Sequence, residues 1–218
     1  QKNKNDWVLF VGGNFKEWEI LFNSKTILNE NYYQEERINE NGLTGCLNFY
    51  DSIFENTKIK TNGGFCEDSI NIVKSIGNLS EIIVQSSFQD GIDLDFSNLK
   101  IDKVKVLNAG NDCLDLSSGT YEINEGVFKN CNDKSLSVGE KSNLTINNIF
   151  ANNSNTGIAV KDLSYVKTKN INMIGVKFCV DAFQKKKEFG GGYAVLENIN
   201  CDGSYKKDSQ SIIDIKNK

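Results

Sequence analysis

Three aspartates and one lysine have the residue types and spacing that could do chemistry in this chain. Asp93 and Asp95 lie in the segment D-G-I-D-L-D, and Asp115 lies in D-C-L-D-L-S, 22 residues after Asp93. Lys161 ends the later segment G-I-A-V-K. Carboxylate oxygens are the hard ligands that Ca²⁺ prefers, and a desolvated lysine can act as a general base. We therefore predict catalytic roles for Asp93, Asp115 and Lys161, and a Ca²⁺ site formed by Asp93, Asp95 and Asp115.

Two other interpretations of these carboxylates stay open. Asp93 and Asp115 could be the acid/base pair of a glycosidase, because a separation of about 5 Å suits a retaining mechanism. Alternatively, the face is non-catalytic, and aspartates at turn starts cap backbone N–H groups. We favour capping for Asp68, Asp90 and Asp112, but not for Asp93 and Asp115, whose mid-strand carboxylates would repel each other without a proton, a cation or a lysine.

The same face continues towards the C-terminus with residues that could hold a substrate. Asp181 and Phe183 occupy the equivalent strand, and a basic run, K-K-K-E, follows from Lys185 and Lys186. Such a run can bind an anionic chain, although many are simply solvated. We predict that Asp181, Phe183, Lys185 and Lys186 contact a polysaccharide. If the protein is an enzyme, we expect it to cleave this polysaccharide as a lyase or a glycoside hydrolase.

A 22-residue repeat positions these side chains. Apolar residues flank the Asp93 position in successive units and form two columns that keep the same phase. A self-similar period of 20–50 residues indicates a solenoid, in which each unit buries its apolar face by stacking on its neighbours. The first column is Ile70, Ile92, Leu114, Leu136, Ile158 and Val180, and the second is Ile72, Leu94, Leu116, Val138, Val160 and Ala182.

The pattern within each unit favours short strands over helices. The segment 91–95 alternates with period two, which is typical of a strand with one buried face, and a helical apolar stripe is missing from the repeats. Asn108, Asn130 and Asn152 are again 22 apart, as expected for a ladder of stacked amides, with Phe128 and Phe150 two positions before the later two. We predict an all-β, right-handed, single-stranded parallel β-helix with about 22 residues per coil.

The length of 218 residues fits a single domain, 1–218. We expect irregular N-terminal coils and a loop in 1–42, with alternating segments at 7–11 and 18–22 and a polar loop at 29–41. Regular coils should fill 43–204 and a tail 205–218. The chain begins with Gln, so we expect it to be part of a larger protein whose other domains are its partners.

Composition excludes several classes of function. The net charge of −4 argues against a nucleic-acid partner, which needs a basic patch, and the sequence contains no apolar run long enough to span a membrane. The absence of histidine excludes Ser-His-Asp and Cys-His catalysis and His-ligated metal sites.

The six cysteines contain no C-x-x-C pair, so a structural zinc site is not expected. Cys179 and Cys201 are one period apart and could form a disulfide, and Cys46 and Cys66 are a second candidate pair. Buried free thiols are an equally good interpretation.

The repeated blocks also resemble a known superfamily. Segments such as D-G-I-D-L-D-F-S (90–97), G-N-D-C-L-D-L-S (110–117) and N-D-K-S-L-S-V-G-E (132–140) are similar to the β-helix of pectate-lyase-like proteins. More closely, they resemble bacterial β-helix segments joined to CotH-type or lamin-tail domains. The resemblance covers about 43–204 and is specific for the fold, but it implies little about function, because the superfamily contains lyases, hydrolases, epimerases, adhesins and inert scaffolds. We expect an extracellular or cell-surface protein that engages a carbohydrate, or else a non-catalytic adhesin or spacer domain. The Asp-Pro-His of mannuronan epimerases and the Gly-His-Gly of polygalacturonases are absent, so neither activity is implied.

Overall fold

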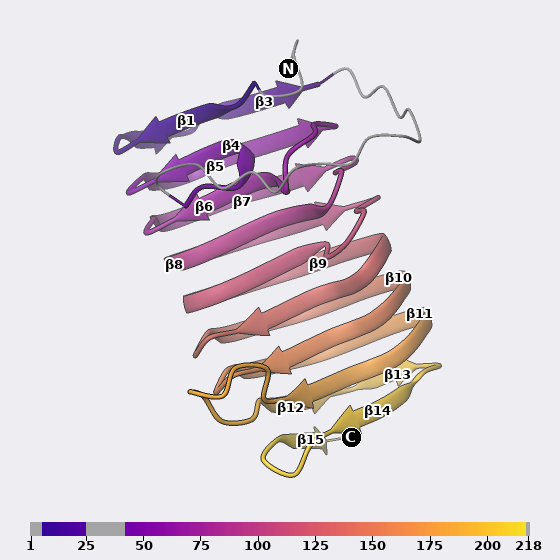
Figure 1. Cartoon of the computed structure of the whole chain (residues 1–218). Helices are drawn as coiled ribbons and strands as arrows, with labels where there is room; N and C mark the ends of the chain where they lie inside the picture. The colour runs from indigo at the N-terminus through magenta and orange to yellow at the C-terminus, as the bar shows by residue number, and fades with distance from the viewer. Residues whose placement is uncertain (1–5, 25–41, 217–218) are drawn as a thin grey trace.

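The computed structural model of the protein describes residues 6–24 and 42–216, and every regular element among them is a β-strand. The predicted loop 29–41 lies outside the described residues. Figure 1 shows the strands stacked into a rod. The strands are β1 (Val8–Val11), β2 (Asn14–Lys16), β3 (Glu19–Asn23), β4 (Gly45–Tyr50), β5 (Ile53–Asn62), β6 (Asp68–Val73), β7 (Ile76–Val84), β8 (Asp90–Val106), β9 (Leu114–Gly139), β10 (Asn143–Lys161), β11 (Tyr165–Phe183), β12 (Tyr193–Glu197), β13 (Ile199–Cys201), β14 (Ser204–Lys207) and β15 (Ile212–Lys216).

All pairings between these strands are parallel, and each coil pairs with the next. Along one side of the rod the order is β1-β4-β6-β8-β9-β10-β11-β12-β15. The register joins residues one period apart, as in Ile92 with Leu114 and Ile158 with Val180. The predicted parallel β-helix with coils of about 22 residues is confirmed. In the described part of the chain, no helix has the length and apolar character needed to cross a membrane.

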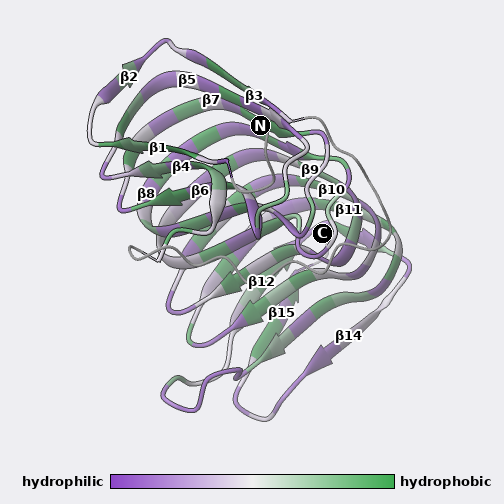
Figure 2. Cartoon of the chain, turned by 45° about the horizontal axis from the view of Figure 1, so that its top comes forward, coloured by the Kyte–Doolittle hydropathy of each residue, from purple (hydrophilic) through white to green (hydrophobic). Residues whose placement is uncertain are grey.

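The two apolar columns form the core of the rod. All of their residues are fully buried, from Ile70 and Ile72 to Val180 and Ala182. Figure 2 shows the result as hydrophobic and hydrophilic stretches that alternate along each coil. Coil-on-coil burial therefore supplies the hydrophobic stabilisation that a single central core supplies in a globular domain.

Residues in the left-handed conformation bend the chain at the end of the Asp93 side in several coils. Lys74 follows the last residue of β6, whereas Phe96 and Ser118 lie at the equivalent bends within β8 and β9, and their φ angles are 51°, 50° and 57°. Hydroxyls stack beside them, since the Ser75 Oγ accepts from the Ser52 N–H and the Ser97 Oγ accepts from the Ser75 N–H. This corner ends the segment that carries the candidate site and turns the chain into the next side of the coil.

One coil contains an extra residue, which corrects the predicted Asn ladder. Between β9 and β10 the register is 23 residues until a bulge between Ser154 and Thr156 restores 22. The amide ladder therefore runs from Asn108 through Asn130 to Asn153, with N–O distances of 3.0 Å at both steps, and not to Asn152. For the same reason Phe128 pairs with Ala151 instead of Phe150. The Asp93 side keeps its 22-residue phase because the bulge comes before it.

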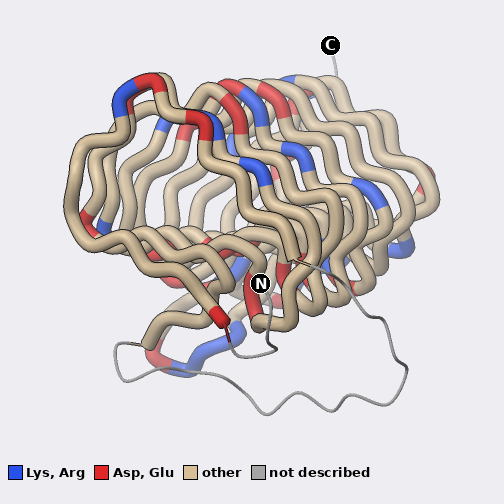
Figure 3. The backbone as a smooth tube through the Cα atoms, turned by 90° about the horizontal axis from the view of Figure 1, so that it is seen from above, with Lys and Arg blue, Asp and Glu red and all other residues tan. Residues whose placement is uncertain are grey.

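Both ends of the chain add strands to the rod. β1, β2 and β3 pair with β4 and β5, as the alternation at 7–11 and 18–22 predicted. At the other end, β14 pairs with β11 and β15 pairs with β12, so the predicted tail continues the coils. Charged residues recur in rows along the outside of the stack (Figure 3), including the cross-coil pairs Lys100–Glu122 and Lys103–Glu125.

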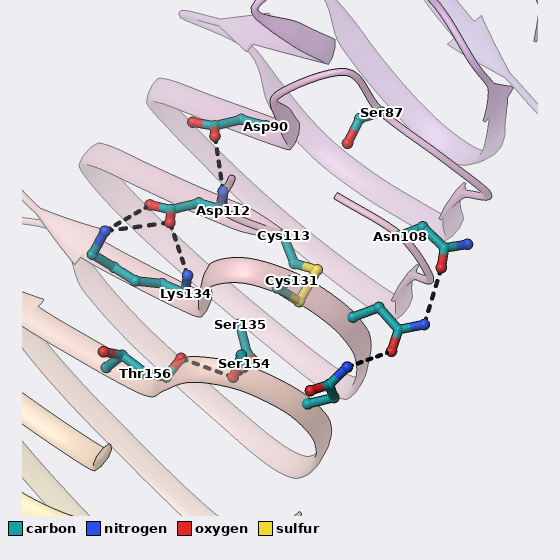
Figure 4. The surroundings of a disulfide bond; sticks show 12 residues. Ser87, Asp90, Asn108, Asp112, Cys113, Cys131, Lys134, Ser135, Ser154 and Thr156 are labelled. Atoms are coloured by element: carbon teal, nitrogen blue, oxygen red, sulfur yellow. Dashed lines mark hydrogen bonds and ion pairs between the residues drawn. A yellow bond between two sulfur atoms is a disulfide. The ribbon is translucent and has the colours of Figure 1, made fainter. Parts of the chain in front are cut away.

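The six cysteines form three disulfides. The two candidate pairs, Cys46–Cys66 and Cys179–Cys201, are both bonded, and Cys113–Cys131 is a third bond that the sequence analysis did not propose. Cys46, Cys113 and Cys179 each directly precede the first inward apolar residue of a strand on the Asp93 side. Each bond therefore ties the start of such a strand to another segment of the stack. Figure 4 shows one of them, the buried Cys113–Cys131 bond, across a corner of the coil.

Candidate functional site

The stacked strands bring the predicted site residues into adjacent columns. Asp93 pairs with Asp115 in the next coil, and Asn71 pairs with Asp93 from the coil before. Asp95 lies two residues along the same strand and faces the same side. The 22-residue spacing therefore places the predicted carboxylates together.

The structure places three more aspartates beside Asp93, Asp95 and Asp115 than the sequence analysis predicted. We call this group the acidic cluster, and its members are Asp68, Asp90, Asp93, Asp95, Asp112 and Asp115. Burial raises the pKa of Asp93 well above its usual range, and the carboxylates of Asp68, Asp95, Asp115 and Asp90 raise it further. Burial likewise raises the pKa of Asp112 to about 7, against the opposing effect of Lys134.

Asp90 and Asp112 cap the turns of successive coils. The Asp112 N–H donates to Asp90 Oδ1 at 2.9 Å, and the Lys134 N–H donates to Asp112 Oδ1 at 3.0 Å (Figure 4). The capping interpretation of these two residues agrees with this geometry. They also lie next to Asp115, because one carboxylate oxygen from each of the three residues lies within 4.8 Å of the other two.

Asp93 and Asp95 share the side-chain amide of Asn71. The Asn71 Nδ2 group donates to Asp95 Oδ2 at 3.2 Å and lies 3.5 Å from Asp93 Oδ2. Within the described residues, Asp93 Oδ1 and Asn71 Oδ1 are buried without a hydrogen-bond partner. Burial raises the pKa of Asp95 to about 6, while the Asn71 amide opposes this rise. A proton or a cation is needed to satisfy this part of the cluster.

Lys161 reaches back across two coils to the acidic cluster. Its ammonium donates to Ser137 Oγ at 2.8 Å and lies 3.8 Å from Asp115 Oδ1. Its stem lies over Gly139, where a Cβ atom would come 2.7 Å from Lys161 Cε. The missing side chain at Gly139 therefore leaves the trough in which Lys161 lies, with 7% of its side chain exposed.

This face is more enclosed than the alternation of the sequence indicated. The outward column contains Asn71, Ser137 and Ala159, which are at most 1% exposed. Two features explain the difference. Coils stacked about 4.8 Å apart shield one another's short side chains, and the stem of Lys161 covers the strand beside it.

The residues predicted to bind substrate do not form one group, because they contact different neighbours in the structure. Asp181 pairs with Lys206 at 3.2 Å, in the next coil. Phe183 lies next to Lys161 in the register of β10 and β11. The Lys185 and Lys186 N–H groups both donate to Asp162 Oδ1, at 2.7 and 2.8 Å, and the Lys186 ammonium pairs with Glu140. The basic run is a loop without strand structure, as expected, and Asp162 holds its first turn.

Sequence reasoning missed the contribution of three residues. Asp90 and Asp112 were assigned to capping, although their position three residues before Asp93 and Asp115 was a signal that they share the corner. Gly139 was missed because its role depends on the Lys161 side chain one coil later. The available signal was that Gly139 precedes Lys161 by one 22-residue period, so the two residues occupy the same column in adjacent coils.

The donor set fits a hard divalent cation. Asp90, Asp112 and Asp115 offer three carboxylate oxygens, and Ca²⁺ takes six to eight oxygen ligands. The buried, unpartnered Asp93 Oδ1 lies in the same cluster. Of the three ligands predicted from the sequence, Asp115 belongs to this triad, whereas Asp93 and Asp95 are gathered around Asn71. Lys134, 3.3 Å from Asp112 Oδ1, competes with a cation for that carboxylate.

Comparison of the chain with protein-family models, curated proteins and solved structures found no match. The resemblance to pectate-lyase-like proteins therefore extends to the parallel β-helix that the structure shows, and the link to CotH-type or lamin-tail segments stays a prediction.

Proposed function

We propose that this β-helix binds an acidic polysaccharide along the face of the acidic cluster, with Ca²⁺ as the bridge. The observation that carries this proposal is the triad of Asp90, Asp112 and Asp115, whose oxygens lie close enough to share one ion. Three protein oxygens leave coordination positions for water and for carboxylates of a uronate chain. A cation would also offset the repulsion that otherwise holds protons on the cluster.

Lys161 gives this arrangement lyase-like chemistry. In β-elimination a base removes the proton at carbon 5 of a uronate, a double bond forms between carbons 4 and 5, the glycosidic bond at carbon 4 breaks, and the leaving oxygen takes up a proton from water. A cation held by Asp90, Asp112 and Asp115 would supply the positive charge that acidifies the proton at carbon 5. Lys161, beside Asp115 and anchored by Ser137, is the candidate base of the described face.

A non-catalytic binding or spacer domain is the second candidate, and the enclosure of the face favours it. Lys161 is buried in its trough, and Ser137 and Ala159 have no exposed surface through which a substrate could reach them. A binding domain needs the cation and the polymer but no access to Lys161.

The three disulfides support a location in an oxidising compartment, because such bonds persist there. We therefore infer an extracellular or cell-surface location, as the sequence analysis also expects. This location is consistent with a polysaccharide partner and with attachment to other domains of a larger protein.

The test is a calorimetric titration of the EDTA-treated protein with Ca²⁺, followed by oligogalacturonate. We expect Ca²⁺ to bind and to raise the melting midpoint by mass action, and the Asp112→Asn/Asp115→Asn double variant to lose both effects. Asp102→Asn is the matched control, because it removes an exposed acid outside the acidic cluster.

Lyase chemistry is tested by the near-ultraviolet absorbance of the new double bond. Absorbance that rises in the wild type and not in Lys161→Met supports the enzyme. Ca²⁺-dependent binding without this signal supports the binding domain. The absence of any Ca²⁺ effect on the wild-type protein would reject the cation bridge.

A further inference from the structure

A hollow lies beside the acidic cluster, on the other side of the same turns. Its volume is about 370 Å³, and four successive coils line it through residues 63–64, 86–88, 108–110, Asn130 and Asn132. All of these described lining residues are Gly, Ser, Phe, Ala or Asn, so the lining carries no charge. We call it the amide hollow.

The amide hollow combines an aromatic ring with a row of amides. The Phe88 ring packs against Phe65, with centroids 6.0 Å apart. The Asn108 amide donates to the Gln85 carbonyl at 3.0 Å and accepts from the Asn130 amide at 3.0 Å. Each amide group has two N–H donors and an oxygen with two lone pairs, so these bonds leave donors and acceptors for a ligand.

The backbone of this hollow is built to bring the coils close together. A Cβ atom on Gly110 would lie 1.8 Å from the Phe88 carbonyl oxygen, so only glycine allows the approach. The Asn130 Oδ1 atom accepts from Asn153 at 3.0 Å, which ties the ladder to the next coil. The ring and amides are therefore held in place before any ligand binds, which lowers the entropic cost of binding.

An uncharged pyranose sugar has the chemistry that these groups recognise. Its C–H face can pack on an aromatic ring, and its hydroxyls can both donate to and accept from amides. A uronate would bring a carboxylate into a lining without a cation, at a desolvation cost. A peptide segment is less well matched, because the edge of the hollow presents side-chain amides and not an unpaired strand.

The position of the hollow connects it to the acidic cluster. Phe88 and Gly110 precede Asp90 and Asp112 by two residues each, and Figure 4 shows Ser87 and Asn108 on one side of the turns and Asp90 and Asp112 on the other. We propose that the amide hollow is a subsite for a neutral sugar of a heteropolysaccharide whose acidic sugars bind at the acidic cluster. This proposal rests on the carbohydrate-binding function proposed above and names its substrate as mixed neutral and acidic.

The experiment uses neutral tetrasaccharides of gluco, manno, galacto and xylo configuration, titrated calorimetrically into the full chain in EDTA. We expect at least one of them to bind the wild type, and Phe88→Ala to weaken it at least tenfold. Ser86→Arg should weaken binding in the same way, because the larger side chain fills the hollow while the Phe88 ring stays in place. This second variant tests whether the weaker binding of Phe88→Ala results from a loss of folding. Phe150→Ala is the matched control, because Phe150 is also half-buried but lines a separate hollow.

The outcomes separate this proposal from the cation bridge. Neutral-sugar binding that survives Asp112→Asn/Asp115→Asn but not Phe88→Ala supports the amide hollow, whatever the fate of Ca²⁺ binding. Failure of all four tetrasaccharides to bind the wild type would overturn it. Binding by Phe88→Ala and Ser86→Arg that is as tight as binding by the wild type would also overturn it. A retained Ca²⁺-dependent uronate interaction in that case would leave the proposed function intact.

Discussion

Replacing Asp95 by asparagine tests whether the ionised carboxylates of the acidic cluster destabilise the folded state. Burial raises the pKa of Asp95 from 3.8 to about 6, and one pKa unit corresponds to about 1.4 kcal/mol. An ionised Asp95 therefore costs the folded state up to about 3 kcal/mol at neutral pH. Part of this cost is shared with Asp93, so we expect asparagine to recover about 1–3 kcal/mol.

The sign of the pH dependence follows from the direction of the shift. The folded state holds the Asp95 proton more tightly than the unfolded chain, so this group favours folding most below a pH of about 4. Its contribution is lost as the pH rises from about 4 to about 6 and then stays constant. In Asp95→Asn this part of the pH dependence should vanish, because the amide does not titrate and can still accept from Asn71 Nδ2.

The assay is urea unfolding of wild type and variant in EDTA, at pH values from about 4 to about 7.5. We expect equal free energies of unfolding at the acidic end and a more stable variant at the neutral end. Asp102→Asn is the matched control, because Asp102 is exposed outside the cluster. A variant that is less stable than the wild type at neutral pH, or has the same pH slope, would refute the reasoning.

Two further predictions concern the packing around the cluster. Gly139→Ala should displace the Lys161 stem and break the 2.8 Å bond to Ser137, at a cost of about 1–3 kcal/mol, and Lys161 should react faster with an amine reagent in peptide mass spectrometry. Cys113→Ser/Cys131→Ser should lower the free energy of unfolding in urea by about 2–4 kcal/mol, because the bond closes a loop within the unfolded chain. An unchanged lysine reactivity would contradict the first prediction. A wild-type midpoint that a reducing agent leaves unchanged would contradict the second.

Much of the fold follows from side-chain periodicity. The columns that begin at Ile70 and Ile72 predict inward positions correctly in every coil, because a strand alternates its side chains and stacking repeats the pattern. The ladder beyond Asn130 could not be predicted in the same way. Its step to Asn153 depends on one extra residue in a coil, which a bulge near Ser154 absorbs.

The sequence predicted which face of the coils carries the candidate site, but it did not predict all of the residues that form the site. The spacing of Asp93 and Asp115 places them in adjacent coils, and the structure agrees. It did not indicate that Asp90 and Asp112 turn their carboxylates towards Asp115 while capping the turns. An aspartate that caps a turn and an aspartate that could bind a cation have the same sequence pattern. Only the path of the backbone through the corner distinguishes these two roles.

The sequence by itself determined the coil length, the strand direction and the columns, because these depend on contacts that recur at one spacing. It also determined that carboxylates meet on one face, since neighbours in a column are neighbours in space. The tertiary structure alone decided which carboxylate oxygens lie within 4.8 Å of one another, how deeply Lys161 is buried and that Cys113 pairs with Cys131. These properties depend on side chains that reach between columns and coils, such as Lys161 over Gly139, and on turns whose geometry carries no period.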